Sequence, residues 1–264
     1  MTLGKEYPIS CYRLSFILFA LVVSSSAYLL GRRKGLDGMK MFVIIAAAGI
    51  GTFLGSRIFF LLTEGGVAAI NVSSIFDWHL LGFSLYGGLI LAGVLVLLSC
   101  WGLGLNPWMT GDAFAPGLGL GLALVKTGCF LNGCCFGKAT SLPWGVSFPP
   151  GSQAHDFQIL NGSVFLFTRT VQLHPLQLYE ALAALSGALG AALILKKNQD
   201  SSGLAILFMF FWFTIWRWFL LDFRAPVPKP PLDSQIFPWI YGAILFLTGI
   251  LALVLVKKRT KQRA

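Results

Sequence analysis

Long apolar stretches, separated by shorter polar ones, follow one another along nearly the whole chain. Seven of them have about the 20 residues that an α-helix needs to cross a hydrocarbon core of roughly 30 Å. They lie at residues 14–31, 41–62, 80–101, 113–131, 177–195, 203–223 and 237–256. The fourth is the weakest helix candidate, because Pro116 and many glycines interrupt it. With no internal repeat and no soluble domain, residues 1–264 are expected to form a single all-α, polytopic membrane domain.

Two longer polar segments interrupt this helical pattern. Residues 132–176 contain the turn-forming sequences PWG, FPPGS and NGS, and within them SVFLFTRTVQL is typical of a strand or an interfacial segment. Residues 224–236 include the proline-rich sequence RAPVPKPPLD, so no helix is expected there. Irregular segments of this kind often carry the functional residues of a protein.

The composition agrees with the membrane class, since 56% of the residues are hydrophobic and only 11% are charged. The formal net charge is +10, and much of it comes from clusters that flank the apolar stretches. If the N-terminus is outside, one side of the membrane carries Arg32, Arg33, Lys34, Lys40, Lys196, Lys197, Lys257, Lys258, Arg259, Lys261 and Arg263. By the positive-inside rule that side is cytoplasmic. The sequence therefore predicts an N-out, C-in topology with both irregular segments outside, and the basic charge does not indicate a nucleic-acid partner.

Four basic residues lie within or directly after the predicted spans: Arg57, Lys126, Arg217 and, next to the end of the sixth span, Arg224. Arg217 and Arg224 are seven residues apart and share one helix face. Cations that converge near the outer leaflet would bind an anionic group, of which lipid phosphate is the nearest. The alternative is that all four side chains extend to the headgroups. That alternative suits Lys126 and Arg224 better than the more deeply placed Arg57 and Arg217.

Polar residues concentrate in the sequence KTGCFLNGCCFGK at 126–138, at the end of the fourth span. Placing polar groups in hydrocarbon costs free energy, so a functional use of these residues is expected. The sequence HPLQLYE at 174–180 adds His174 and Glu180. The imidazole of His174 is suited to proton transfer, or the residue merely lies at the membrane interface. Glu180 is expected either to pair with an arginine or to act in proton transfer.

Cys129, Cys134 and Cys135 are close together in the sequence, but no second pair of ligands accompanies them, so no metal site is predicted. Three interpretations remain open: a disulfide on the outer side, a nucleophilic thiol, or small residues at a close helix contact. The glycines of YGGLI at 86–90 match no phosphate-binding fingerprint, although Gly87 and Gly88 would leave room beside a site.

Taken in order, these elements resemble the bacterial prolipoprotein diacylglyceryl transferase family over nearly the whole chain. The matching segments are Pro8-Ile9 with Tyr12, LGSRIFF at 54–60, YGGLI at 86–90, KTGCFLNGCCFGK at 126–138, PWGVSFP at 143–149, HPLQLYE at 174–180, and Arg217 to Arg224 with Ser234-Gln235.

The resemblance implies an enzyme of the bacterial plasma (inner) membrane, with its active site toward the outer face. Members of the family transfer the diacylglyceryl group of phosphatidylglycerol to the lipobox cysteine thiol of a preprolipoprotein and release glycerol phosphate. They use no metal and no cofactor. The expected partners are therefore phosphatidylglycerol, lipobox signal peptides and membrane lipid.

The resemblance also implies roles for individual residues. The expected catalytic residues are Tyr86, Lys126, Asn132, Gly137, His174, Glu180 and Arg224. The expected substrate-binding residues are Tyr12, Arg57, Gly87, Gly88, Cys129, Cys134, Arg217 and Gln235.

The chain departs from the family pattern at four positions. Tyr86 stands where the family has a histidine, Lys126 an arginine, Cys129 an asparagine and Cys134 a glutamate. Lys126 keeps the charge but not the planar fork of arginine, and tyrosine, with an ordinary pKa of about 10, is a poor base at neutral pH. The chain is thus expected to catalyse the family reaction, or to be a paralogous lipid-group transferase that uses another acceptor through its cysteines. A non-enzymatic lipid-binding or transport protein is a further alternative.

Overall fold

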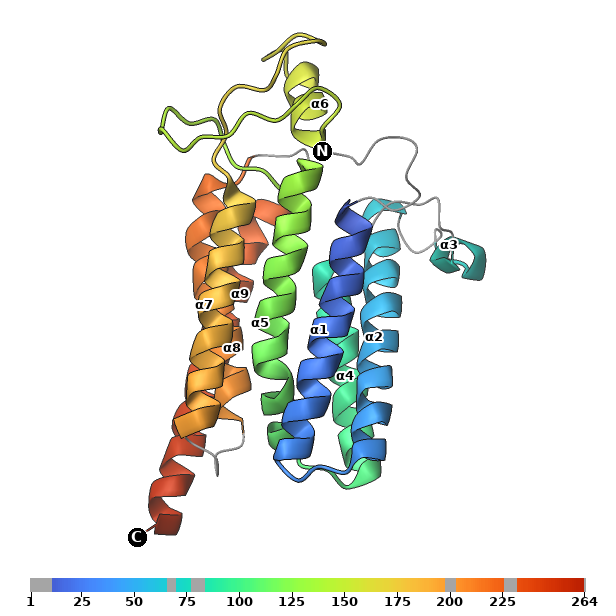
Figure 1. The fold of residues 1–264 in the computed structure, drawn as a ribbon, viewed down its shortest axis with the longest axis vertical. Helices are drawn as coiled ribbons and strands as arrows, with labels where there is room; N and C mark the ends of the chain where they lie inside the picture. The colour runs from blue at the N-terminus through green and yellow to red at the C-terminus, as the bar shows by residue number, and fades with distance from the viewer. Residues whose placement is uncertain (1–10, 66–69, 77–83, 198–202, 226–231, 264) are drawn as a thin grey trace. The chain divides into compact units, whose positions relative to one another are not determined.

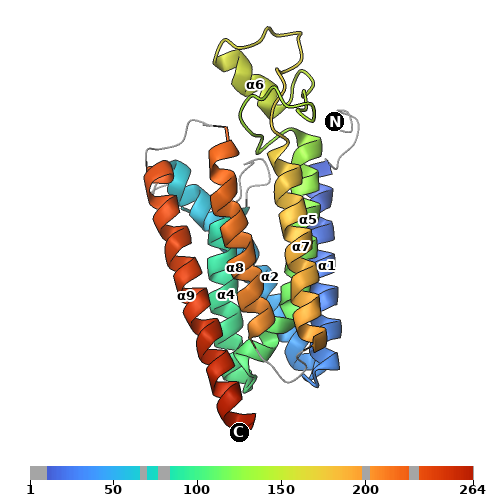
Figure 2. The ribbon, with the colours of Figure 1, turned by 90° about the vertical axis from the view of Figure 1, so that its left-hand side faces the viewer.

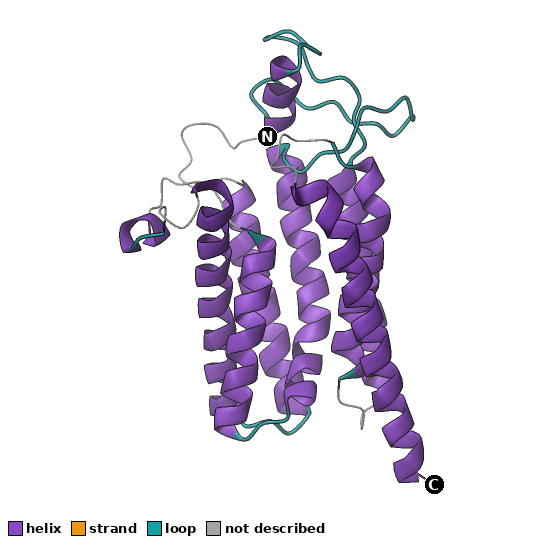
Figure 3. Cartoon of the chain, turned by 180° about the vertical axis from the view of Figure 1, so that it is seen from behind, coloured by secondary structure: helices purple, strands orange, loops and turns teal. Residues whose placement is uncertain are grey.

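The computed structural model of the chain describes residues 11–65, 70–76, 84–197, 203–225 and 232–263. Most of these residues are helical, as Figure 3 shows by colour. The helices are α1 (Cys11–Arg33), α2 (Gly38–Gly65), α3 (Val72–Phe76), α4 (Leu85–Leu103), α5 (Pro107–Asn132), α6 (Gln153–Leu160), α7 (Leu176–Lys197), α8 (Leu204–Phe219), the 3₁₀ turn η2 (Leu220–Phe223) and α9 (Leu232–Arg263). The described residues form isolated β-bridges but no strand.

Six segments among the described residues are long and apolar enough to cross a membrane. They are Cys11–Arg33, Gly38–Leu62, Pro107–Asn132, Leu176–Lys197, Leu204–Phe223 and Pro238–Lys257. The predicted span at 80–101 corresponds to α4, whose apolar part Gly87–Leu103 is shorter. The prediction of an all-α, polytopic membrane protein is therefore confirmed. The count of seven spans, the N-out orientation and the single domain stay predictions.

The irregular segments differ from expectation in two respects. Residues 232–236, predicted to be non-helical, begin α9, because the prolines of this segment all precede Leu232. The sequence SVFLFTRTVQL forms turns rather than a strand, and only its Leu173 makes β-bridges, with Ala139 and Val146. Pro116, by contrast, lies inside a continuous α5.

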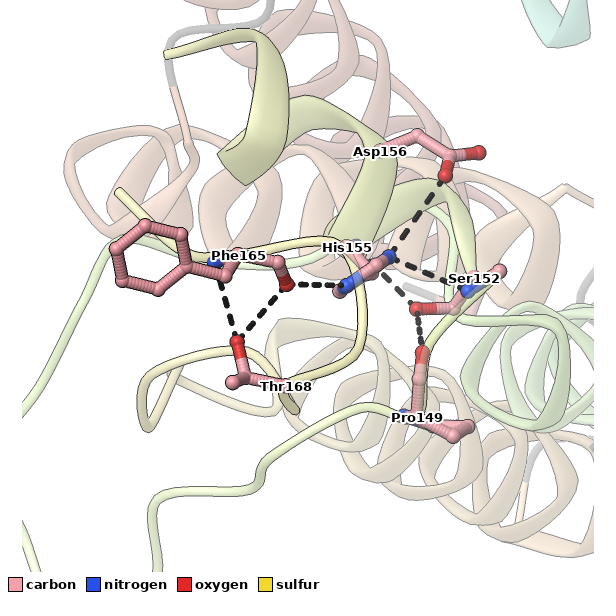
Figure 4. A network of polar contacts seen from close by, with 7 residues as sticks. Pro149, Ser152, His155, Asp156, Phe165 and Thr168 are labelled. Carbon is pink, nitrogen blue, oxygen red and sulfur yellow. Dashed lines mark hydrogen bonds and ion pairs between the residues drawn. The ribbon is translucent and has the colours of Figure 1, made fainter. Parts of the chain in front are cut away.

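The short helix α6 within the 132–176 segment was not predicted from the sequence. Figure 4 shows the polar contacts that fix it around His155, a side chain only 2% exposed. Nδ1 of His155 accepts a hydrogen bond from the backbone N–H of Gly151 at 3.2 Å, so Nε2 carries the proton and faces the carbonyl oxygen of Phe165 at 3.4 Å. Ser152 caps the helix, its Oγ accepting from the His155 N–H. These contacts give the segment a defined structure.

The chain forms two compact units. Residues 24–113 make up one, here called the α2–α4 unit, and residues 1–23 with 114–264 make up the other, the α7–α8 unit.

In the α2–α4 unit, glycines allow α2 and α4 to approach closely. A Cβ atom added at Gly51 would lie 2.6 Å from the Cα of Ala92, and one added at Gly55 would overlap the backbone carbonyl of Gly87. Small residues at a helix contact have this effect in membrane proteins, where van der Waals packing rather than water exclusion holds helices together. At the far end of the unit, Lys40 Nζ donates to the carbonyl oxygen of Leu103 at 2.8 Å.

We expect Gly55→Ala to destabilise the protein by about 1–3 kcal/mol, because the added methyl group would push against backbone that cannot rotate away. The matched control is Gly49→Ala in the same helix, where an added Cβ meets nothing within 4 Å. That control should be neutral or slightly stabilising, since alanine favours helix more than glycine does. Thermal unfolding in detergent measures both, and equal midpoints for the two variants would contradict close packing at Gly55.

In the α7–α8 unit, α5 and α7 run side by side (Figure 1), and α8 lies beside α9 (Figure 2). The core between α5, α7 and α8 contains Ala115, Leu122, Ala123, Ala181, Ala184, Ala191, Ala205, Ile206 and Met209. Its many alanines bring the helix backbones together, and a Cβ atom added at Gly119 would lie 2.7 Å from the carbonyl oxygen of Ala184.

Main-chain hydrogen bonds join three distant segments at one end of this unit. The N–H of Gly137, just after α5, donates to the carbonyl oxygen of His174 at 3.1 Å. The N–H of Lys138 donates to the carbonyl oxygen of Phe223 at 2.8 Å, and that of Ala225 to Phe136 at 3.3 Å. The chain after α5 is therefore held between the start of α7 and the end of η2, and this arrangement positions the charged side chains described next.

Candidate functional site

Four charged side chains from α5, α7, α8 and the end of η2 meet in the α7–α8 unit. Glu180, on the second turn of α7, is 2% exposed. Its Oε2 pairs with Lys126 Nζ, and its Oε1 with Arg217 Nη1. Nη1 of Arg224 lies 3.9 Å from the same Oε1. The structure thus brings together Lys126, Glu180, Arg217 and Arg224, which the sequence had predicted as site residues.

Local backbone structure aims these side chains at one another. Lys126 precedes the end of α5 by less than two turns, and Arg217 lies in the last turn of α8. After Arg217 the helix tightens into η2 and then becomes extended at Arg224, with φ −76° and ψ 136°. Because Gly137 forms a β-bridge with Arg224, the position of this arginine is set by main-chain contacts rather than by its side chain.

The cluster carries excess positive charge, since three cations share one carboxylate. Nη1 of Arg224 is buried and has no hydrogen-bond acceptor among the residues that the structure describes. A buried donor without an acceptor is costly, so an acceptor is expected there when the protein works. The arrangement can bind an anion with several oxygens. These oxygens would accept hydrogen bonds from the N–H groups of the cations that Glu180 does not bind.

The three cysteines of the 126–138 sequence also come together. Cys129 lies in the last turn of α5, Cys134 and Cys135 follow the helix, and their three Sγ atoms lie within 4.8 Å of one another. All three thiols are free. Hydrogen bonds from the thiols of Cys129 and Cys134, together with the charges of Lys126 and Arg224, lower the pKa of Cys135 well below its ordinary value. Cys135 was not among the predicted site residues, and of the three thiols it is the one whose pKa its neighbours lower.

Three further predicted residues lie around these groups. Asn132 ends α5, and its side chain lies within interaction range of the Cys134 thiol. Tyr12 is half-buried on α1, packs edge-to-face on Phe16 with ring centroids 4.9 Å apart, and lies within electrostatic range of the three cysteines. Gly137 packs so closely against His174 that an added Cβ would lie 2.6 Å from the Cβ of His174.

His174 belongs to an aromatic network at the start of α7. Its Nδ1 lies 3.4 Å from the Tyr179 hydroxyl, which also accepts a hydrogen bond from Trp144 Nε1 at 2.8 Å. The His174 ring packs edge-to-face on Phe223, with centroids 5.1 Å apart. These contacts give His174 a structural role, because they hold Gly137 and Phe223 in place. Its role in proton transfer stays a prediction.

Gln177 is a residue that sequence reasoning did not select. It is fully buried on α7, and its Nε2 donates to the carbonyl oxygen of Cys134 at 2.6 Å. A polar residue three positions before Glu180 on an apolar helix shares its face, and this spacing is the signal that would have revealed it.

Of the remaining predicted residues, some lie in the other unit, and the side chains of the others are not described. In the α2–α4 unit, Arg57 is 1% exposed and donates from Nε and Nη2 to the carbonyl oxygen of Ser74, at 3.2 and 3.0 Å. Gly87 and Gly88 face α2, and Gly87 lines an apolar groove of about 280 Å³ with Gly55 and Phe59. The side chains of Tyr86 and Gln235 lie outside the described residues.

Comparisons with known proteins point in one direction. A family model described as prolipoprotein diacylglyceryl transferase matches residues 1–256. The chain is 25% identical over 260 residues to phosphatidylglycerol--prolipoprotein diacylglyceryl transferase 2 of Clostridium perfringens, covering 95% of this chain and 93% of the relative. It is 28% identical over 234 residues to the transferase of Wolbachia pipientis wMel, covering 83% and 80%. For the transferase of Leifsonia xyli subsp. xyli the identity is 27% over 266 residues, covering 96% and 77%.

Proposed function

Because the chain belongs to the prolipoprotein diacylglyceryl transferase family, we infer that it is a membrane enzyme of lipoprotein biosynthesis, a phosphatidylglycerol–prolipoprotein diacylglyceryl transferase. Phosphatidylglycerol is the donor and a prolipoprotein the acceptor. We propose further that the accepting group is the lipobox cysteine thiol, and that the reaction takes place at the outer face of the bacterial inner membrane.

The observation that carries this proposal is the positive cluster around Glu180, with a buried Arg224 donor that lacks a hydrogen-bond acceptor among the described residues. In the reaction, the acceptor thiol gives up its proton, its sulfur bonds to the glycerol carbon, and the bond from that carbon to the phosphate oxygen breaks. The departing phosphate can take up the proton. Glycerol phosphate leaves with the electron pair of the broken bond. Fixed cations that face a leaving phosphate stabilise the charge that develops on it.

We assign the phosphate to Arg224 first, with Lys126 and Arg217 supporting it. Both oxygens of Glu180 are engaged by Lys126 and Arg217, which favours a positioning role for this carboxylate over that of a base. Asn132 and Gly137 lie on the segment beside this cluster and are proposed to line the reacting centre. The roles of Tyr12, Arg57, Tyr86, Gly87, Gly88 and Gln235 stay predictions from the resemblance.

The proposal is tested with purified protein in micelles that contain phosphatidylglycerol and a synthetic lipobox peptide. We expect release of glycerol phosphate together with a gain of one diacylglyceryl mass on the peptide, and no product with a peptide that has serine in place of the cysteine. No product under conditions in which the Clostridium perfringens relative is active would overturn the proposal. Glycerol phosphate released without peptide modification would instead support the paralogous transferase that uses another acceptor.

A further inference from the structure

The three thiols of Cys129, Cys134 and Cys135 converge on one point at the end of α5, where their Sγ atoms lie within 4.8 Å of one another. Cys129 and Cys134 are 4% and 7% exposed, whereas Cys135 is half-buried. Two of the three residues are therefore buried, and the third keeps partial exposure.

A helix cap brings the first two cysteines together. The N–H of Cys134 donates to the carbonyl oxygen of Cys129, and the N–H of Gly133 to that of Phe130, both at 3.1 Å. Gly133 has φ +68°. These are the two hydrogen bonds and the left-handed glycine of a Schellman motif, in which the side chains of the third-last helical residue and the second residue beyond the cap commonly meet. Here those two positions are Cys129 and Cys134.

The backbone at Cys135 brings in the third thiol. Adjacent side chains in an extended chain point in opposite directions, so Cys134 and Cys135 would not face one group. Cys135, however, has φ +56° and is the one non-glycine residue with positive φ among those described. This conformation costs a non-glycine residue roughly 1–2 kcal/mol. Here this backbone conformation directs the thiols of both Cys134 and Cys135 toward Cys129.

The surroundings suit a set of thiolates. Lys126 and Arg224 lie within electrostatic range of Cys135 and would offset the negative charge that thiolates keep after binding a cation. The carbonyl of Cys134 is fixed by the buried amide of Gln177. An outer contact of this kind orients a metal ligand.

We propose that Cys129, Cys134 and Cys135 form a three-sulfur binding site for a soft, thiophilic metal ion. Three sulfurs about 2.3 Å from one ion lie roughly 4 Å apart, so the cluster needs to contract by less than about 1 Å from its present span. Sulfur ligands select zinc, copper(I) and cadmium over magnesium or calcium, which require oxygen. The sequence had predicted no metal because a second ligand pair is missing, but a three-sulfur site does not require one.

The test uses the full-length protein in detergent, reduced and treated with a chelator, and titrated with Cd²⁺ as the probe. We expect uptake of one ion per chain with sulfur-to-metal charge-transfer absorption in the ultraviolet. Cys129→Ser, Cys134→Ser and Cys135→Ser should each weaken binding by at least about 10–100-fold, since even outer-contact changes have effects of that size. Cys11→Ser is the matched control and should leave binding unchanged.

A second measurement uses the native chain alone, so its result does not depend on whether the serine variants fold. Bound Cd²⁺ should protect Cys129, Cys134 and Cys135 from alkylation, as mapped by mass spectrometry of the native chain, while Cys11 keeps its reactivity. The proposal is overturned if Cd²⁺ uptake is absent, if the serine variants bind as well as the native chain, or if the three thiols alkylate equally with and without the ion. A stable disulfide between two of them in protein isolated without reductant would likewise overturn it.

Discussion

Replacing Arg224 with alanine is expected to slow diacylglyceryl transfer by about 10²–10³-fold, the usual effect of removing one donor that stabilises charge in a transition state. Arg224 is the cation of the cluster whose buried Nη1 lacks a hydrogen-bond acceptor among the described residues, and it lies 3.9 Å from Glu180. Its loss should leave the fold largely intact, because main-chain hydrogen bonds hold the residues on either side, from Lys138 to Phe223 and from Ala225 to Phe136. The measurement is the rate of glycerol phosphate release at saturating peptide.

The matched control for this prediction is Arg224→Lys. Lysine keeps the positive charge but has no planar fork, so activity should fall between that of the native enzyme and that of the alanine variant. A rate for Arg224→Ala within a factor of two of the native rate, with unchanged thermal stability, would mean that the phosphate binds elsewhere.

Glu180→Gln is expected to destabilise the protein by about 3–5 kcal/mol, which is typical when one partner of a buried charge pair is removed. The carboxylate is nearly inaccessible and pairs with Lys126 and Arg217, and glutamine would leave both cations without this negative charge. Thermal unfolding in detergent measures the effect.

Two comparisons separate this explanation from a general loss of structure. Asp222→Asn removes an exposed carboxylate on the neighbouring η2 and should change the unfolding temperature little. Glu180→Gln combined with Arg217→Met removes one of the cations as well and should recover part of the loss. An unfolding temperature for Glu180→Gln equal to that of the native protein would contradict a stabilising role for the ion pairs.

The sequence predicted the spans well, because the requirement for about 20 apolar residues acts locally. The predicted range 177–195, for example, corresponds to α7 at Leu176–Lys197. Pro116 does not end α5, and the helix continues to Asn132. The apolar stretch around Pro116 therefore favours helix more strongly than one proline disfavours it. The segment outside the spans was harder, because α6 depends on contacts between His155 and the distant carbonyl of Phe165.

The candidate site was predictable in part for the same reason. A charge inside or next to an apolar stretch is a strong local signal, and it identified Lys126, Glu180, Arg217 and Arg224 without knowledge of their neighbours. The meeting of three cysteines was not predictable in this way. It depends on the left-handed backbone at Gly133 and Cys135, and a non-glycine residue gives no sequence sign that it will adopt that conformation.

The ion pairs of Glu180 also have a consequence for how the protein is made. A chain synthesised from its N-terminus delivers Lys126 to the membrane first, where a lysine near a helix end can extend to the headgroups. Glu180 is inserted next, when Lys126 is already present to pair with it. Arg217 follows and can pair with Glu180. From Glu180 onward each newly inserted charge therefore meets one of opposite sign, so neither α7 nor α8 is inserted with its buried charge uncompensated.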